Sequence, residues 1–369
     1  MKYWRGYLVA AIAAAGAWGL RAFSEAHGSL VDMVYPYLTR MIQSFLADWS
    51  GSVGFCVWQV MLTVLVILAL ATAVMMIVFK WNPIQWLGWV LAAVCVIGLL
   101  DTGIYGLNQY AGDLSQDIYL KKAEYRYSAD ELEAAAVFYR DKANALADQI
   151  TRDENGNVLF ADFETLAQQA GGGFYTLTYE KHLSVFAGSR VPVKKLNADG
   201  LFISKTATGK TVALTGESAV NPKIPAVSLP FAMCHEMAHR MCIAIDRDAD
   251  FAAFLACDAN ASPEFQYSAY FMAFVHCYEV MKAVGIGNGE TAPERYESGI
   301  GNNLRHDLNS YYSFFGANAA TDSQVFDLLV IWHIEKYVLP LQEDEEVLFD
   351  PKDEDSVDLS GIVNAKPKA

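Results

Sequence analysis

Two long stretches without a charged residue constrain the fold of this chain more than any other feature. The first covers residues 51–79 and the second residues 81–100, with Lys80 between them. Each is long enough to cross the hydrocarbon core of a bilayer as a helix, which takes roughly 20 residues. A helix in a soluble core is rarely apolar on all sides over such a length. The sequence therefore predicts a membrane protein.

A shorter, alanine-rich apolar run lies between Arg5 and Arg21. It fits either a membrane helix or the apolar part of a signal peptide, and we favour the helix. Together with the two longer runs it predicts a membrane anchor over residues 1–105. Within this anchor we expect three transmembrane helices, at about residues 6–22, 53–79 and 82–104.

The positive charges beside the apolar runs predict how the chain crosses the membrane. Lys2 and Arg5 precede the first run, and Lys80 lies in the short turn between the other two. Cytoplasmic segments keep an excess of lysine and arginine, so the amino end and this turn are expected inside. A loop over residues 22–50 and a folded domain over residues 106–342 are then expected on the extracytoplasmic side of the cytoplasmic (inner) membrane.

The formal net charge of −15 is concentrated in part near the carboxyl end. Eight carboxylates and one lysine lie between Glu343 and Asp355, so we expect residues 343–369 to form an acidic, disordered tail. The sequence contains no basic patch of the kind that binds nucleic acid, and no nucleic-acid partner is expected. The lipid bilayer is the partner that the composition does predict.

Between the anchor and the tail, the sequence indicates a mainly helical domain with a small sheet. Ser128 and Glu131 form the capping-box pattern of a helix start. Glycines at 171–173 are expected to stop a later helix. Alternating and β-branched residues over 195–220 predict a small antiparallel sheet with a hairpin turn at residues 208–209.

The sequence His235-Glu236-Met237-Ala238-His239 is the clearest chemical motif in the domain. On a helix, positions four apart lie roughly 6 Å apart along the axis on one face, so both imidazoles can converge on one ion. Neutral imidazole suits Zn²⁺, and a neighbouring glutamate can take a proton from an attacking water. The motif predicts His235 and His239 as metal ligands and Glu236 as the catalytic base. The alternative is two histidines on a helix surface.

A third metal ligand is expected a few residues further on. Thermolysin-like metallopeptidases often carry it on a second helix in the pattern E-x-x-[AS]-[DN], whose last residue orients a ligand histidine. Residues 246–250, DRDAD, resemble this pattern with aspartate in place of glutamate. Asp246 is then the ligand and Asp250 the orienting residue, and Asp248 is the alternative ligand.

The spacing between His239 and Asp246 imposes a condition on the backbone. On one unbroken helix the two residues would be separated by roughly 10 Å along the axis, too far to reach one ion. We therefore expect the helix to end within residues 241–245 and the chain to turn there, although neither glycine nor proline marks such a turn.

The residues around the motif resemble a bacterial family of membrane-anchored proteins classed as domain of unknown function 3810. Its pattern has HE-x-AH, a short link that contains glycine, and then E-x-E-A-N-F. The resemblance extends to TGESAVN at 215–221, LPF at 229–231 and FQYS at 265–268, and three membrane segments fit it too. This chain departs from the pattern in having Cys242 at the glycine and aspartates at both glutamates.

The members of that family are inferred to be zinc metallopeptidases, so the resemblance implies a zincin-like, gluzincin-type α+β domain that carries the HExxH helix. It implies Zn²⁺ as the cofactor and a peptide or protein as the substrate. In related hydrolases an edge strand upstream of the motif pairs with the substrate backbone. Residues 212–217 are such a strand or a plain surface hairpin, with Glu217 and Asn221 as candidate substrate-binding residues. Tyr267 is the candidate catalytic donor to an oxyanion.

These observations predict a membrane-anchored, zinc-dependent metallopeptidase that hydrolyses peptide bonds by Glu-assisted attack of zinc-bound water. The alternative is a membrane protein that keeps the metallopeptidase fold as a binding or assembly module. The two aspartate replacements and the missing glycine favour this alternative. The charged residues Arg240, Asp246, Arg247, Asp248 and Asp250 disfavour a motif that lies within the membrane.

Overall fold

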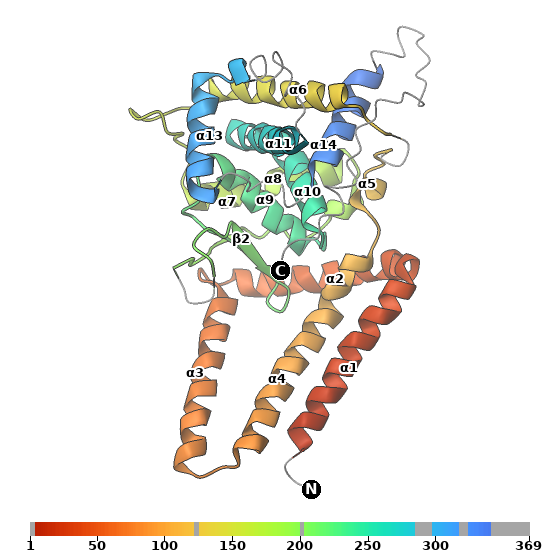
Figure 1. The fold of residues 1–369 in the computed structure, drawn as a ribbon, viewed down its shortest axis with the longest axis vertical. Coiled ribbons are helices and arrows are strands. Elements are labelled where there is room, and N and C mark those ends of the chain that lie inside the picture. The colour runs from red at the N-terminus through yellow and green to blue at the C-terminus, as the bar shows by residue number, and fades with distance from the viewer. Residues whose placement is uncertain (1–3, 122–124, 200–202, 285–296, 317–323, 341–369) are drawn as a thin grey trace.

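The structure, a computed structural model, describes residues 4–121, 125–199, 203–284, 297–316 and 324–340. Its first part confirms the three predicted membrane-length helices, which extend to one side of the remaining chain (Figure 1). They are α1 (Arg5–Ala26), α3 (Val57–Val78) and α4 (Pro83–Ile104). The predicted acidic tail, residues 343–369, lies outside the described residues.

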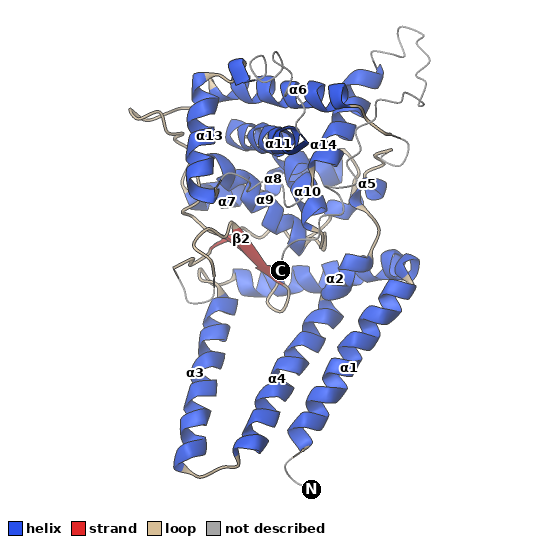
Figure 2. Cartoon of the chain, in the orientation of Figure 1, coloured by secondary structure: helices blue, strands red, loops and turns tan. Residues whose placement is uncertain are grey.

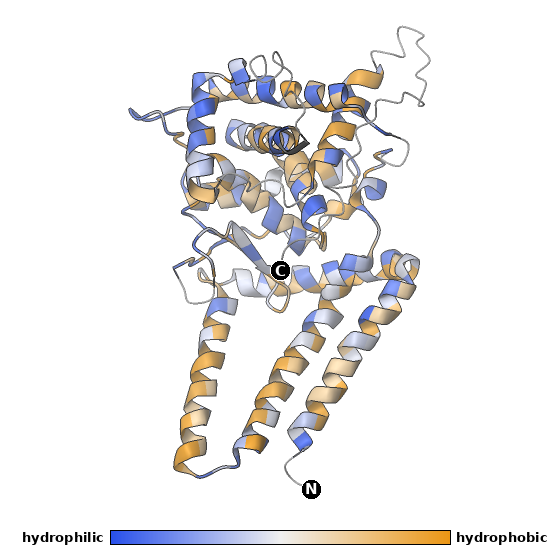
Figure 3. Ribbon diagram, in the orientation of Figure 1, coloured by the Kyte–Doolittle hydropathy of each residue, from blue (hydrophilic) through white to orange (hydrophobic). Residues whose placement is uncertain are grey.

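The membrane-length helices follow from local sequence. None of the α3 side chains is buried within the protein, and the helix is coloured as hydrophobic along most of its length (Figure 3). Pro83 occupies the first turn of α4, and the Asn82 side chain accepts hydrogen bonds from the Ile84 and Gln85 backbone amides. Proline and asparagine are suited to these positions because the first amides of a helix have no partner within the helix.

The segment between α1 and α3 differs from the sequence expectation. Residues 22–50 were expected to form an external loop, but the structure has the helix α2 (Gly28–Gly51) there, with Pro36 inside it. This helix crosses the ends of α1 and α4 at a steep angle and lies between the membrane-length helices and the domain (Figure 1).

The domain is mainly helical, as predicted (Figure 2). Its longer helices are α6 (Ala129–Ala147), α9 (Leu229–Arg240), α10 (Asp246–Asp258), α11 (Pro263–Val284) and α13 (Asn302–Phe315). The shorter ones are η1 (Gly106–Tyr110), α5 (Leu114–Asp117), α7 (Phe163–Gln169), α8 (Gly171–Tyr175), η3 (Thr176–Glu180), η4 (Ser184–Phe186), η5 (Ala226–Ser228), α14 (Phe326–His333) and η6 (Ile334–Val338).

Two local predictions for these helices have opposite outcomes. The capping box at the start of α6 is present, with Ser128 and Glu131 bonded in both directions. The glycines at 171–173 do not stop the chain from being helical, because they form α8. A Cβ on Gly173 would lie 1.7 Å from the Ala256 carbonyl oxygen, so glycine allows α8 to approach α10 closely.

The small sheet is mixed rather than antiparallel. It contains β1 (Lys194–Lys195), β2 (Gly209–Val212) and β3 (Glu217–Val220) in the order β1-β3-β2. β2 is antiparallel to β3 as predicted, but β1 is parallel to it. The hairpin turn lies at residues 213–216 instead of 208–209, because Gly209 already pairs with Val220 and Gly216 supplies the positive φ of +65°.

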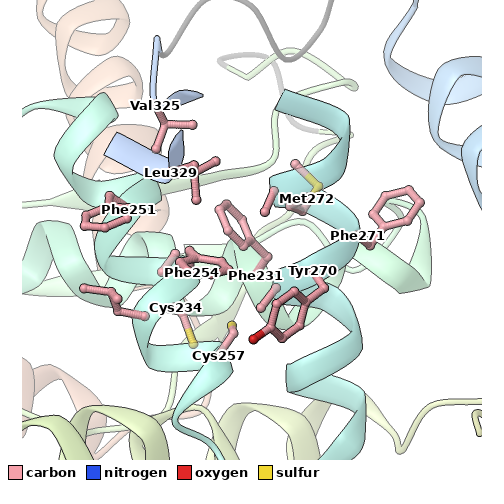
Figure 4. Close-up of a cluster of buried hydrophobic side chains, with 14 of the residues drawn as sticks. Phe231, Cys234, Phe251, Phe254, Cys257, Tyr270, Phe271, Met272, Val325 and Leu329 are labelled. Carbon is pink, nitrogen blue, oxygen red and sulfur yellow. The ribbon is translucent and has the colours of Figure 1, made fainter. Parts of the chain in front are cut away.

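The motif helix α9 lies inside the hydrophobic core. Met233, Cys234 and Met237 are fully buried. Aromatic and aliphatic side chains from α10, α11 and α14 surround this part of the helix, and a cluster of them is shown in Figure 4. The labelled residues of the cluster are Phe231, Cys234, Phe251, Phe254, Cys257, Tyr270, Phe271, Met272, Val325 and Leu329. Close packing of this kind fixes the helix on which the histidines lie.

Candidate metal centre

The chain reverses between the motif helix and the next helix, as the spacing of the candidate ligands predicts. α9 ends at Arg240 and α10 begins at Asp246. Cys242 provides the reversal with a φ of +70°. This is the left-handed conformation for which glycine is the usual residue after a helix end. Cys242 therefore adopts a positive φ at a position where glycine is usual.

His235, His239 and Asp246 come together at this reversal. His235 Nε2 lies 3.0 Å from His239 Nε2, and His239 Nε2 lies 3.2 Å from a carboxylate oxygen of Asp246. One ligand atom from each residue lies within 4.8 Å of the other two. Ligands in a tetrahedral zinc site, with bonds of about 2.0–2.1 Å, are roughly 3.3 Å apart. Two of the three donor-atom distances are therefore close to this spacing, and the donors are of types that bind zinc.

The remaining ring nitrogens of the two histidines have hydrogen-bond partners on the protein side. His235 Nδ1 lies 2.7 Å from an Asp250 carboxylate oxygen, and His239 Nδ1 lies 2.8 Å from the Ile243 carbonyl oxygen. Histidines that bind metals usually donate their other N–H to such groups, which fixes the ring and its tautomer. The two Nε2 atoms are left to face each other, and His239 Nε2 also faces Asp246. Asp250 thus contacts His235, the contact that its predicted orienting role requires.

Asp248, the alternative ligand, has different partners. Its side chain is buried, pairs with Arg247 at 2.9 Å and accepts a hydrogen bond from the Leu114 amide at 3.1 Å. Burial raises the pKa of Asp248, and Arg247 opposes this effect. The structure therefore brings Asp246 rather than Asp248 to the histidines.

The electrostatics of the cluster favour a cation. Burial opposes protonation of His235, but the carboxylates of Asp250, Glu236 and Asp246 outweigh it and raise the pKa of His235 to about 9. Contact with the His239 ring lowers the pKa of Asp246. Without a metal ion, the cluster holds a proton on His235 near neutral pH, and a metal ion would have to displace it.

Glu236 is held between the motif helix and the sheet. The residue is 4% exposed, and the Thr211 hydroxyl on β2 donates to its carboxylate at 2.6 Å. The Ser218 hydroxyl on β3 donates to its backbone carbonyl at 2.7 Å. A Cβ on Gly209 would lie 2.6 Å from a Glu236 carboxylate oxygen, so the glycine lets β2 pass close to the carboxylate. The position of this side chain depends on the sheet as well as on α9.

Three other candidates lie in separate hydrogen-bond networks. Buried Glu217 pairs with Lys194 at 2.6 Å and accepts from the first amides of α3. Buried Asn221 donates to the Lys205 and Ala207 carbonyls. Tyr267 donates to Asp307, which also pairs with Arg152. These contacts stabilise the fold, and among the described residues none of them includes the histidine cluster.

Sequence reasoning missed several residues that support the site. Thr211 and Ser218 hold Glu236, and Tyr105 donates from its hydroxyl to the His239 carbonyl at 3.0 Å. Arg40 donates to the Met241 carbonyl at 3.1 Å, just after α9 ends. These partners are far from the motif in sequence, and their residue types carry no signal of such a role.

The comparisons with known proteins agree with the family resemblance. No curated protein and no solved structure matches the chain. A family described as "Protein of unknown function (DUF3810)" matches residues 32–330, which include most of α2, the candidate metal ligands and most of the domain. Because the match covers well over half of the sequence, the chain belongs to this family of proteins of unknown function.

Proposed function

We propose that the protein is a membrane-anchored, zinc-dependent metallopeptidase with a zincin-like, gluzincin-type domain outside the cytoplasmic membrane. The observation that carries this proposal is the convergence of His235, His239 and Asp246 from two helices onto one point. Two imidazoles and one carboxylate leave a fourth position open, which is typical of catalytic rather than structural zinc sites.

The residues around the cluster fit the same metal. Asp250 and the Ile243 carbonyl hold the histidines with Nε2 toward the cluster. When bound there, zinc would polarise a substrate carbonyl and lower the pKa of a water molecule. Asp246 and the two histidines would hold the ion, and Asp250 would fix the His235 ring in the tautomer whose Nε2 faces the ion.

Glu236 would act as the general base for hydrolysis of a peptide bond. It follows the first ligand in sequence, and the Thr211 hydroxyl holds its carboxylate in place. An ionised carboxylate at this position takes a proton from the attacking water and passes it to the leaving amine. The β2 strand covers the Glu236 carboxylate, which is largely shielded from water. A shielded carboxylate interacts more strongly with neighbouring charges than one in water.

A second candidate function is a binding or assembly module with the same fold. The observation in its favour is the close cover of Glu236 by β2, which leaves the residue 4% exposed. The Thr211 hydroxyl occupies one of the two Glu236 carboxylate oxygens, so β2 restricts the access of water and substrate to the base. On this alternative the metal site would hold two helices together without supporting hydrolysis.

Hydrolysis of a broad peptide mixture separates the two functions. The zinc-loaded, full-length protein in nanodiscs would be incubated with a proteome-derived peptide library, and new chain ends would be identified by mass spectrometry. The Glu236→Gln variant, which keeps the ligands, is the matched control.

The peptidase proposal predicts new ends with the wild type and at least about a hundredfold fewer with Glu236→Gln, at equal zinc content. A chelator should abolish cleavage by the wild type, and zinc should restore it. Equal cleavage by both proteins would contradict Glu236 as the base. A zinc-loaded wild type that cleaves nothing would support the binding module.

A further inference from the structure

We propose that α2 lies in the plane of the membrane surface, with its outer face in the bilayer interface and its inner face bonded to the metal-site helix. The sequence expectation for this segment was an external loop. α2 has 24 residues, so it is about 36 Å long at 1.5 Å per residue. It is not among the helices that are apolar enough to cross a membrane.

The outer face of α2 is a continuous strip of large apolar side chains. Its members recur at intervals of three and four residues, which places them on one side of a helix. Each of them is at least 45% exposed, and Met41 and Phe45 are more than two-thirds exposed. The strip consists of Leu30, Met33, Val34, Tyr37, Leu38, Met41, Phe45 and Trp49. Eight such residues in one strip on a surface helix indicate an interaction site rather than ordinary scatter.

All three charged side chains of α2 bond to the rest of the protein. Asp32 accepts from the Gly112 amide at 2.7 Å, and Arg40 donates to the Met241 and Ser184 carbonyls. Asp48 accepts from the Ser189 hydroxyl at 3.2 Å. The helix is therefore divided into a polar face toward the domain and an apolar face away from it.

The lipid bilayer is the partner that fits the apolar face, because membrane helices hold both ends of α2. α1 ends at Ala26, directly before α2 begins, and α3 starts at Val57, shortly after α2 ends at Gly51. The Tyr35 hydroxyl also donates to the Thr102 carbonyl in the last turn of α4. α2 must then lie where these three helices leave the bilayer. Helices in such a position bury their apolar face roughly 5–10 Å into the interface.

The inner face of α2 connects the membrane surface with the metal-site elements. Arg40 bonds to the residue after α9, and the Gln43 amide donates to the Ala213 carbonyl in the β2–β3 turn. The metal-site helix and the strand that covers Glu236 are thus both fixed to a lipid-facing helix. The substrate class follows only if the proposed peptidase function holds: substrates would then be chain segments close to the membrane surface.

The depth of α2 in the membrane can be measured on the full-length protein in phospholipid nanodiscs. Cys95, the only described cysteine that is not buried, would first be replaced by alanine. A fluorescent label would then be attached to a single new cysteine at Met41 or Phe45. Labels at Ile67 in the middle of α3 and at Glu154 on an exposed loop would mark a deep and a fully aqueous position.

Lipids with a quencher at a shallow or a deep acyl position would report where each label lies. We expect labels at 41 and 45 to lose most of their emission with the shallow quencher. The label at 67 should lose most of its emission with the deep quencher, and the label at 154 should keep its emission with both. Labels at 41 and 45 that behave like the label at 154 would overturn the proposal. So would quenching as deep as at 67. Because no step needs metal or hydrolysis, this result is independent of the peptidase proposal.

Discussion

Cys242 is the residue whose backbone conformation brings the candidate metal ligands together. With a φ of +70°, it turns the chain between α9 and α10, so that Asp246 returns to His239. A side chain in the left-handed region costs about 1–2 kcal/mol relative to glycine. The chain therefore tolerates strain at the position that brings Asp246 to His239.

This strain predicts that glycine at position 242 gives a more stable protein than alanine, which is the reverse of their order inside a helix. Cys242→Gly should have the higher thermal midpoint in detergent, and Cys242→Ala the lower, by the equivalent of about 1 kcal/mol. The same two substitutions at the buried Cys277, in the interior of helix α11, serve as the matched control. There alanine should be the more stable, because glycine weakens a helix interior. Alanine above glycine at both sites would contradict the role given to Cys242.

Asp250 determines how zinc binding should depend on pH. Its carboxylate helps to raise the pKa of His235 to about 9, and zinc bound by His235, as proposed, would have to displace that proton. Between pH 7 and 9 the apparent affinity of the wild type should therefore rise by about tenfold per pH unit. Competition with a chromophoric chelator measures this slope.

The Asp250→Asn variant should show a flatter slope over the same range, because His235 then loses its proton at lower pH. At pH 9, where this competition is smallest, the variant should bind zinc about 10- to 100-fold more weakly for lack of the orienting carboxylate. Identical slopes for the two proteins would show that Asp250 does not control the protonation of His235.

At the scale of elements, α1 and α4 depend on small residues where they cross. A Cβ on Gly6 would lie 2.4 Å from the Gly88 carbonyl carbon, and one on Gly88 would lie 2.8 Å from the Tyr7 ring. Ala10, Ala13 and Ala92 continue this contact as buried residues. Small residues allow membrane helices to approach closely, and van der Waals packing then holds them.

Gly88→Leu should separate α1 from α4 and lower the thermal midpoint of the detergent-purified protein by the equivalent of about 1–3 kcal/mol. Gly98→Leu is the matched control, since it lies in the same helix and a Cβ there meets nothing within 4 Å. Its midpoint should stay at the wild-type value. A similar loss in both variants would mean that leucine is harmful in α4 regardless of the crossing.

The elements that sequence predicted correctly are those with strong local signals. The runs without charge specify α3 and α4, and the capping box specifies the start of α6. α2 was missed because Asp32, Arg40 and Asp48 interrupt its apolar residues, and only their contacts with the domain explain them. The parallel pairing of β1 with β3 joins segments far apart in the chain, which no local pattern records.

At the scale of the whole molecule, the candidate site likewise has parts that local sequence predicts and parts that depend on tertiary contacts. His235, Glu236 and His239 could be found from spacing alone, and the turn before Asp246 followed from the length of a helix. The choice of Asp246 over Asp248 needed the tertiary contacts, because Leu114 and Arg247 bind Asp248 elsewhere. The supports from Arg40, Tyr105 and Thr211 come from three separate parts of the fold.

The central claim is a zinc site made of His235, His239 and Asp246, and zinc content per chain tests it most directly. Elemental analysis of the detergent-purified, full-length protein after zinc loading and removal of free metal should give about one Zn²⁺ per chain. His235→Ala and Asp246→Ala should lose it, while Asp248→Asn should keep it. No zinc in the wild type, or undiminished zinc in His235→Ala and Asp246→Ala, would contradict the account.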